Sequence, residues 1–282
     1  MHVASEAQTC GFLRHVRSCS NAVLPGERLP FLIGEAPVGW VRPALARALA
    51  GFPEIAVASD RVVLRGAAAL PNIARSLAAQ GHYRWRNEAF DVRATQDGPA
   101  LAQIDRGAIP SFGVVAVGVH VNGLVHRPDG LHVWIARRAA DKLLDPRKLD
   151  HITAGGVPAG LTPEQTLVKE AAEEAAIPAE LARQARCVAT IRYAMERPEG
   201  LRRDLLYCYD LDLPEDFSPC AADGEVEGFE LWPITRVFQT VRDTGEFKFN
   251  VNLVLIDLFL RHGLIPAHDA ASLRAALDAG RA

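Results

Sequence analysis

Three glutamates that lie close together in the sequence offer the clearest chemistry. Glu170, Glu173 and Glu174 are separated by three and four residues, so a helix would carry them on one face within one turn. Three like charges at this spacing repel each other, and a divalent cation turns that repulsion into attraction. Mg²⁺ prefers hard oxygen ligands and usually retains water and phosphate oxygens around it. The pattern therefore predicts a magnesium site, while a solvated acidic helix face is the alternative that the spacing alone leaves open.

A glycine-rich turn before this helix brings backbone oxygens to the same place. Residues 154–160 read Ala-Gly-Gly-Val-Pro-Ala-Gly, and glycine lets backbone approach closely because it has no Cβ atom. Thr162 fits the N-cap, Pro163 the first helical position and Gln165 the capping box. These features predict a helix over residues 163–176 that begins beside the glycine turn.

The composition restricts the class of protein around this site. The chain has 282 residues, 49% of them hydrophobic and 23% charged, which is typical of one or two globular domains. Its net charge of -3 gives no basic excess for nucleic acid. No apolar run reaches the roughly 20 residues of a membrane span, and the polar N-terminus does not resemble a secretory signal. Five cysteines without a C-x-x-C pair favour reduced thiols, so we expect a cytoplasmic protein.

The hydrophobic and turn patterns divide the chain near residue 112. Residues 1–112 are predicted to form a small α+β unit and residues 113–282 a second domain that carries the glutamates. In the first unit we expect strands at residues 39–41 and 61–64 and helices at residues 43–50 and 71–79. A hairpin is expected between residues 83–85 and 89–93. In the second we expect strands at residues 114–125, 131–136, 187–193, 204–211 and 228–232. Two further helices are predicted there at residues 250–262 and 268–279.

Residues 155–177 resemble the Nudix box, G-x5-E-x7-R-E-U-x-E-E-x-G-U with U aliphatic. The positions that match are Gly155, Glu170, Glu173, Glu174 and Ile177. The positions that depart are Leu161, Lys169 and Ala176, which replace Glu, Arg and Gly. In the family, that Glu and that Arg mainly pair with each other and hold the loop on the helix.

The flanking sequence resembles one Nudix branch, which has an extra N-terminal domain and also occurs fused to thiamine pyrophosphokinase in fungi. The segments that carry this resemblance are residues 118–123, 134–138, 148–150, 211–217, 223–227 and 247–250. The resemblance implies a Nudix α/β/α sandwich around a mixed sheet, preceded by a small α+β domain. It also implies Mg²⁺, or Mn²⁺ in its place, with Glu170 and Glu174 as direct ligands. Glu173 would be a ligand or a catalytic, water-orienting group, and the carbonyl of Ala154 would complete the shell.

A Nudix enzyme often uses a further acid outside the box as a base or ligand. Glu225 is the catalytic candidate, and Glu227 lies on the same face of an extended segment, where it would contact substrate. Substrate contacts are also expected from Arg137, Arg138 and Lys142, since guanidinium and ammonium groups bind phosphate oxygens. His120 and Asn122 alternate with the valines of their strand and so face away from them, either into the pocket or into the domain junction.

The implied reaction is metal-dependent hydrolysis of a small organic diphosphate. The branch points to thiamine diphosphate or its damaged oxo and oxy analogues, cleaved to the monophosphate. Alternatives are a Nudix hydrolase for ADP-ribose or another nucleoside diphosphate derivative, and a non-catalytic Nudix-fold ligand-binding module. Isomerisation on the same fold would need a pocket cysteine such as Cys187 or Cys208. The N-terminal unit would cover the site, contact substrate or form a homodimer interface, and the sequence does not choose among these roles.

Overall fold

A computed structural model describes residues 2–221 and 224–281 of the chain. The N-terminal unit is built on a small sheet with strand order β2-β1-β4-β3, beside a two-stranded sheet of β5 and β6. Its core gathers buried side chains from both sheets and from the helices, including Phe31, Leu77, Phe90 and Phe112. The elements are β1 (Leu29–Ile33), β2 (Ala36–Val41), α2 (Pro43–Leu49), β3 (Ile55–Val57), β4 (Val62–Leu64), the 3₁₀ turn η1 (Ala67–Ala69), α3 (Leu70–Ala79), β5 (Ala89–Val92), β6 (Ala102–Asp105) and α4 (Ile109–Phe112).

The second unit is built on a larger mixed sheet with strand order β11-β12-β7-β8-β13. The β12–β7 pair is parallel, and the other neighbours on this path are antiparallel. The strands are β7 (Val115–Arg127), β8 (Gly130–Arg138), β11 (Arg186–Arg197), β12 (Gly200–Asp212) and β13 (Val226–Pro233), with two short strands, β9 (Leu149–Asp150) and β10 (Thr153–Gly156), off the main path.

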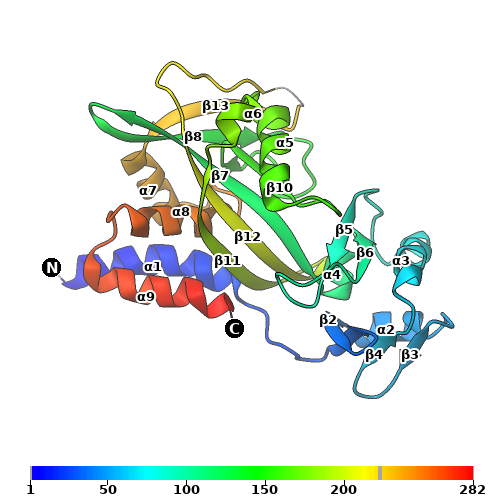
Figure 1. Cartoon of the computed structure of the whole chain (residues 1–282). Helices are drawn as coiled ribbons and strands as arrows, with labels where there is room; N and C mark the ends of the chain where they lie inside the picture. Colours follow the sequence, from blue (N-terminus) through cyan, green and yellow to red (C-terminus); the bar gives the residue numbers. More distant parts are fainter. Residues whose placement is uncertain (1, 222–223, 282) are drawn as a thin grey trace.

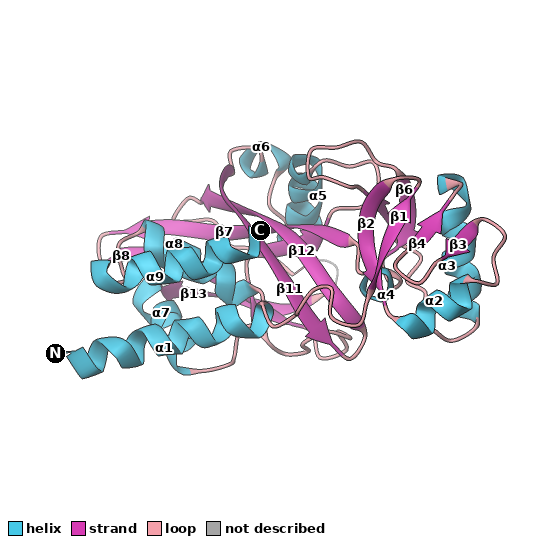
Figure 2. Cartoon of the chain, turned by 90° about the horizontal axis from the view of Figure 1, so that it is seen from below, coloured by secondary structure: helices cyan, strands magenta, loops and turns pink. Residues whose placement is uncertain are grey.

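Helices cover both faces of this sheet, as Figures 1 and 2 show. One face packs under α5 (Pro163–Ala175) and α6 (Ala179–Ala182), and its core includes Val119 and Val121 of β7. The other face packs under α1 (His2–Cys19), α7 (Ile234–Asp243), α8 (Val251–Arg261) and α9 (Ala267–Asp278), which is followed by the turn η2 (Ala279–Arg281). Alternate residues of a strand point to opposite faces, so β7 supplies both cores. The predicted α/β/α sandwich around a mixed sheet, preceded by an α+β unit, is confirmed.

The β9–β10 segment fills a gap in the sheet and brings backbone to α5. Strands β7 and β8 pair near their connecting turn, from Gly123 to Arg127 of β7. Farther from the turn they separate, and there β10 pairs with β7 while β9 pairs with β8. The glycines of β10 therefore lie in the sheet directly beneath α5, which is the placement that the glycine turn predicted.

Some local predictions were wrong or incomplete. Residues 83–85 form no strand, and β5 pairs with β6 instead, so the predicted hairpin is replaced by one with a longer connection. Helices α1 and α7 were not anticipated. Phe12 of α1 packs against Phe238 and Phe259 of the second unit, so α1 contributes to that unit's core although it precedes the N-terminal unit in sequence. The boundary near residue 112 stays a prediction. In the described residues, no helix is both long enough and apolar enough to cross a membrane.

Candidate active site

Helix α5 begins with a complete capping box. The Thr162 hydroxyl accepts from the N–H of Gln165 at 3.2 Å, and the Gln165 side chain accepts from the N–H of Thr162 at 2.9 Å. Pro163 suits the first turn because its missing N–H would have no helical partner there. The helix ends at Ala176, whose φ of 54° is left-handed. The predicted helix is confirmed, and its capped first turn fixes the glutamates relative to the glycine-rich loop.

Glu174 is the most buried of the three glutamates, with 7% of its surface exposed. One of its oxygens accepts hydrogen bonds from the Thr153 hydroxyl at 2.7 Å and from the N–H of Ala154 at 2.9 Å. Burial raises the pKa of Glu174 to about 8, although both hydrogen bonds act in the opposite direction. The N–H and C=O of one strand residue point to the same edge, so the carbonyl of Ala154 also points away from β7.

Glu170 lies directly on the backbone of the glycine loop. A Cβ atom at Gly155 would be 2.5 Å from Cδ of Glu170, so the position tolerates glycine alone without displacing that side chain. The Glu170 side chain is 16% exposed. Burial raises its pKa, and the negative charges of Glu173 and Glu225 add to that effect while Lys169 opposes it. Glu225 is distant in sequence but lies close enough to Glu170 to raise the pKa of its carboxyl.

A lysine balances two of the helix acids in this structure. Lys169 Nζ lies 3.1 Å from an oxygen of Glu170 and 2.6 Å from an oxygen of Glu173. The side chains of Lys169 and Glu173 are 45% and 51% exposed. Exposed ion pairs contribute little, about 0–1 kcal/mol, so a divalent cation can displace the ammonium group at small cost.

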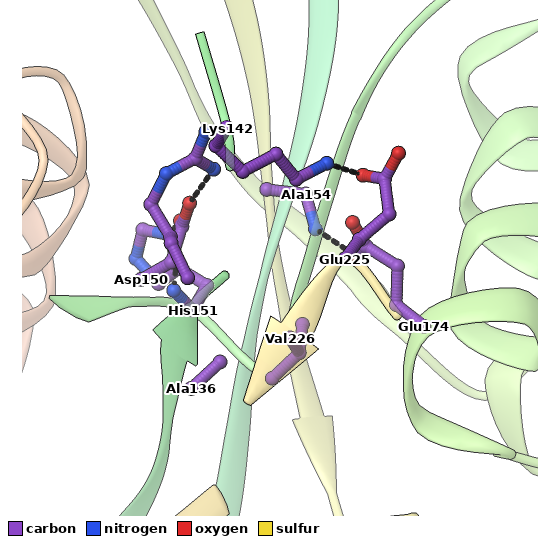
Figure 3. Close-up of a pocket in the computed structure, with 9 residues that line it drawn as sticks. Ala136, Lys142, Asp150, His151, Ala154, Glu174, Glu225 and Val226 are labelled. Atoms are coloured by element: carbon purple, nitrogen blue, oxygen red, sulfur yellow. Dashed lines mark hydrogen bonds and ion pairs between the residues drawn. The ribbon is translucent and has the colours of Figure 1, made fainter. Parts of the chain in front are cut away.

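Several of the predicted residues meet in one pocket between α5 and the ends of β8 and β13 (Figure 3). Lys142 extends across the pocket and forms an ion pair with Glu225 above Ala154 and Glu174. The pocket lining brings the carboxylates of Asp150, Glu174 and Glu225 together with the cationic groups of Arg138 and Lys142, an arrangement that suits an anionic ligand held together with a metal ion. Its lining is Ala136, Arg138, Lys142, Asp150, His151, Ala154, Glu174, Glu225 and Val226.

Two of the predicted residues on the same strands lie outside the pocket lining. Arg137 follows the opposite alternation to Arg138 and donates to the carbonyl of Arg147 at 3.2 Å. Glu227 is exposed in a β-bulge, where the register of β13 shifts between residues 226 and 228. The bulge breaks the simple alternation that was expected to place Glu227 beside Glu225.

His120 and Asn122 are buried on the face of β7 that points away from α5. His120 is 3% exposed, and its Nδ1 lies 3.0 Å from Nδ1 of His151. Asn122 is fully buried and donates to Asp210 at 2.9 Å. Neither side chain reaches the pocket in this structure, because hydrogen bonds within the core hold both of them. His151, which the sequence did not single out, is the member of this group that lines the pocket.

Comparison with known proteins gives the family. Residues 11–116 match a domain of unknown function (DUF4743), and residues 116–250 match the NUDIX domain. Over 268 residues, the chain is 38% identical to Nudix hydrolase 24, chloroplastic, from Arabidopsis thaliana, covering 90% of this chain and 73% of that protein. The chain belongs to the Nudix hydrolase family. It is also 36% identical over 275 residues to Nudix hydrolase 20, chloroplastic, from the same plant, covering 90% of this chain and 74% of that protein.

Among solved structures, the chain is similar to the DR0079 protein of Deinococcus radiodurans, with a TM-score of 0.44 and 19% identity over 60% of this chain and 97% of that one. The identity to named Nudix hydrolases along most of the chain makes this protein an enzyme of that class.

A buried charge network supports the floor of the Nudix pocket. Arg138 Nη1 lies 2.8 Å from Asp150, and Lys248 Nζ lies 3.5 Å from the same carboxylate oxygen. Burial opposes the charge of Asp150, but Lys248 and Arg138 outweigh it and hold the pKa of Asp150 well below its usual range. Burial also lowers the pKa of Lys248. The sequence analysis noted residues 148–150 and 247–250 only for their family resemblance, and no local pattern indicated this network.

The pocket histidine is neutral. Burial lowers the pKa of His151 to about 4, and it lowers the pKa of His120 well below the usual value. Nε2 of His151 is buried without a hydrogen-bond partner in the described structure, and Nε2 of His120 lies 3.4 Å from the Asn250 amide. If the Asn250 amide donates to Nε2 of His120, the proton of neutral His120 lies on Nδ1 and is donated to Nδ1 of His151. The proton of neutral His151 then lies on Nε2, which becomes an N–H donor beside the pocket.

Two groups of side chains compare differently as metal sites. His120, Asp150 and His151 place ligand atoms within 4.8 Å of one another, but Asp150 is already balanced by two cationic side chains. Glu170, Glu173 and Glu174 present hard oxygen donors of the kind that Mg²⁺ and Mn²⁺ prefer. The absence of a Cβ at Gly155 lets the Glu170 side chain lie against the backbone, and the burial of Glu174 outweighs its two hydrogen bonds and raises its pKa. Both features are compatible with a hard cation beside these acids.

The cysteines that isomerisation would require lie elsewhere. Cys208 is fully buried in the core on the α8 face of the sheet. Cys187 is exposed on β11. Neither belongs to the pocket lining, so the geometry favours hydrolysis.

Proposed function

We propose that this Nudix hydrolase cleaves the diphosphate group of a small organic diphosphate with Mg²⁺, for which Mn²⁺ can substitute. Glu170 and Glu174 would hold the ion directly, together with the carbonyl of Ala154, and Glu173 would bind it or orient water. The observation that carries this proposal is the buried carboxyl of Glu174, which is hydrogen-bonded to neutral groups beside Glu170 and the glycine loop. When bound, the ion supplies neutralisation of phosphate oxygens and a lower pKa for the attacking water.

The chain's own groups divide the remaining work. Arg138 and Lys142 contact the substrate phosphates from the β8 side of the pocket. Lys142 pairs with Glu225 in this structure, and a bound phosphate competes for the same ammonium group. Released from that pair, the Glu225 carboxylate accepts a proton from the attacking water. Phosphoryl transfer depends chiefly on positioning and charge neutralisation, which this arrangement supplies without a covalent intermediate.

For the substrate we propose thiamine diphosphate or its oxo and oxy analogues, with the monophosphate as product. Support for this choice comes from the sequence resemblance to the Nudix branch that is fused to thiamine pyrophosphokinase in fungi. ADP-ribose and other nucleoside diphosphate derivatives are the competing substrates. The deciding experiment tests thiamine diphosphate and its analogues against nucleoside diphosphate derivatives at equal concentration with Mg²⁺. Phosphate release is measured for each compound, and nucleotide products are detected by coupling the reaction to a phosphatase.

The metal mechanism is tested with Glu174→Gln. This change keeps the shape and one hydrogen-bond acceptor but removes the negative charge, and we expect kcat to fall by at least about 100-fold. Glu180→Gln is the matched control, because Glu180 is an exposed acid on the neighbouring helix α6, and it should retain full activity. Phosphate release that persists in excess EDTA, or in Glu174→Gln, would show that the reaction does not use this site.

A further inference from the structure

The N-terminal unit contacts the cation-binding loop through an aromatic ring. Phe90 of β5 is 3% exposed and belongs to the core of the N-terminal unit. Its ring lies on Gly156 of β10, where an added Cβ would be 2.5 Å from Cζ of Phe90. The neighbouring glycine, Gly155, faces Glu170 instead. Two consecutive glycines therefore bring the same short strand against the N-terminal unit on one side and against the metal-binding helix on the other.

Backbone hydrogen bonds join the same two segments. The N–H of Ala159 donates to the carbonyl of Ala89 at 2.8 Å. The N–H of Gly160 donates to Oδ2 of Asp91 at 3.3 Å. Three successive residues of β5 thus hold residues 156–160, one through its carbonyl, one through its ring and one through its carboxylate. The side chain of Asp91 is only 11% exposed and is itself fixed by Arg93 at 2.8 Å.

Toward α5, no ion pair joins the loop to the helix within the part of the chain that the structure describes. Leu161 is apolar, and Lys169 is engaged by Glu170 and Glu173, which are acids of the helix itself. The loop is held to the sheet by the N–H of Val157, which donates to Val117 at 2.8 Å. Ala159 and Gly160 of this loop are instead hydrogen-bonded to the N-terminal unit.

We propose that the N-terminal unit sets the geometry of the cation-binding loop, with Phe90 as the positioning residue. This inference rests on the proposed cation site. Because Phe90 is anchored in a packed core, the unit holds β10 rigidly and keeps Gly155 and the carbonyl of Ala154 in place against the acids of α5. Sites with a loose supporting shell lose affinity even when every ligand is present. The unit is thus a structural part of the active site.

The test is a double-mutant cycle on the metal-free full-length protein, with Mn²⁺ binding followed by electron paramagnetic resonance. Gly156→Ala forces a Cβ into the ring of Phe90, and we expect the Kd for Mn²⁺ to rise by about tenfold. Phe90→Leu removes the far end of the ring and should raise the Kd by about fivefold. In the double variant, the added methyl group occupies the vacated space, so the Kd should return to within about threefold of the wild-type value.

Gly155→Ala is the matched control for this cycle. Its Cβ would overlap Glu170, so Mn²⁺ binding should weaken equally with Phe90 or Leu at position 90. A second control is Phe31→Leu, since Phe31 is fully buried in the same core but contacts Phe112. This variant should lose comparable stability while keeping wild-type Mn²⁺ affinity.

Hydrogen exchange gives a readout that needs neither metal nor substrate. In the metal-free protein, amide exchange at Ala159 and Gly160 should accelerate by about tenfold in Phe90→Leu relative to Phe31→Leu. Wild-type affinity and exchange in Phe90→Leu, or a Gly156→Ala defect that Phe90→Leu does not relieve, would overturn the inference. Failure of the wild-type protein to bind Mn²⁺ would instead overturn the proposed cation site on which the inference rests.

Discussion

Two buried carboxylates lie at the β9–β10 segment and differ in the groups that contact them: Asp150 belongs to β9, and Glu174 of α5 is hydrogen-bonded to β10. We call these residues and their partners the Asp150 cluster and the Glu174 cluster. Asp150 lies within 2.8 Å of Arg138 and 3.5 Å of Lys248. Glu174 accepts hydrogen bonds from the neutral Thr153 hydroxyl and from a backbone N–H. Asp150 and Glu174 are comparably buried, at 6% and 7% exposed, so the partner, rather than burial, distinguishes the two clusters.

The difference appears in the protonation of the two acids. Burial raises the pKa of both, yet Lys248 and Arg138 bring the pKa of Asp150 well below its usual range, while that of Glu174 is raised to about 8. Among the described residues, no cationic side chain forms an ion pair with Glu174, and the more distant charge of Lys248 does not offset its burial. A cation from solution would favour the charged form of this carboxyl. The charges of the Asp150 cluster are therefore balanced within the chain, whereas in the proposed function a metal ion balances the Glu174 cluster.

The largest effect is expected from breaking the Asp150 cluster. Asp150→Asn leaves Arg138 and Lys248 without their counter-charge, and removing one partner of a buried ion pair costs about 3–5 kcal/mol. Urea unfolding of the metal-free protein measures this loss. Asp212→Asn is the control, because the Asp212 side chain is 43% exposed and pairs on the surface, and it should change stability by less than about 1 kcal/mol. Equal stability of the two variants would contradict the assignment of Asp150 as a balanced buried charge.

The second prediction concerns the Glu174 cluster and has the opposite sign. The folded pKa of Glu174 exceeds its ordinary value of 4.5, so the folded state binds more protons than the unfolded state between pH 4.5 and about 8. Stability without metal must then fall as pH rises through this window. Glu174→Gln removes the ionisation and should stabilise the metal-free protein at pH 8 by up to about 4 kcal/mol.

The control for this second prediction is the same pair of proteins at pH 4, where the carboxyl is protonated in both states and the difference should vanish. Thermal unfolding at both pH values gives the comparison. A stability difference that does not change with pH would mean that Glu174 is already ionised in the metal-free protein.

The third prediction connects Glu174 to the metal directly. Binding of Mg²⁺ requires the carboxylate, so a group with a pKa of about 8 should release about 0.9 proton per ion bound at pH 7. Titration calorimetry in buffers of different ionisation enthalpy measures the number. The number of protons released should decrease above pH 8. If Glu174→Gln still binds Mg²⁺, that binding should release no proton. Binding without proton release at pH 7 would place the ion away from this carboxyl.

The sequence predicted the helices and strands whose signals are local. The capping box at Thr162 and the valine alternation of β7 each depend on a few neighbouring residues, and both were read correctly. Helix α1 was missed because its partners, such as Phe238 and Phe259, are more than 200 residues away in the sequence. The predicted strand at residues 83–85 failed for a similar reason, since β5 pairs across a longer connection with β6.

The site was predictable to the extent that spacing determines position. Glutamate spacing on a helix and the glycine turn indicated that Glu170 and Glu174 lie beside a backbone carbonyl, and the family resemblance assigned that carbonyl to Ala154. The contacts of His151 and Lys248 depend on how β7 and β8 separate around β10, which no local pattern encodes. The contact between Phe90 and Gly156 joins residues that are 66 positions apart in the sequence, and only the packed structure shows it.

The smallest expected effect separates helix stability from the chemistry of both clusters. Ala176 ends α5 with a left-handed φ of 54°, a conformation that costs a non-glycine residue roughly 1–2 kcal/mol. Glycine avoids this cost, but its greater conformational entropy in the unfolded state cancels part of the gain. Ala176→Gly should therefore stabilise the protein by about 0.5–1 kcal/mol, measured by urea unfolding. The side chain is exposed and carries no charge, so the proton release on Mg²⁺ binding should stay at its wild-type value. A change in proton release would mean that the end of α5, and not only the burial of Glu174, sets the protonation of the metal site.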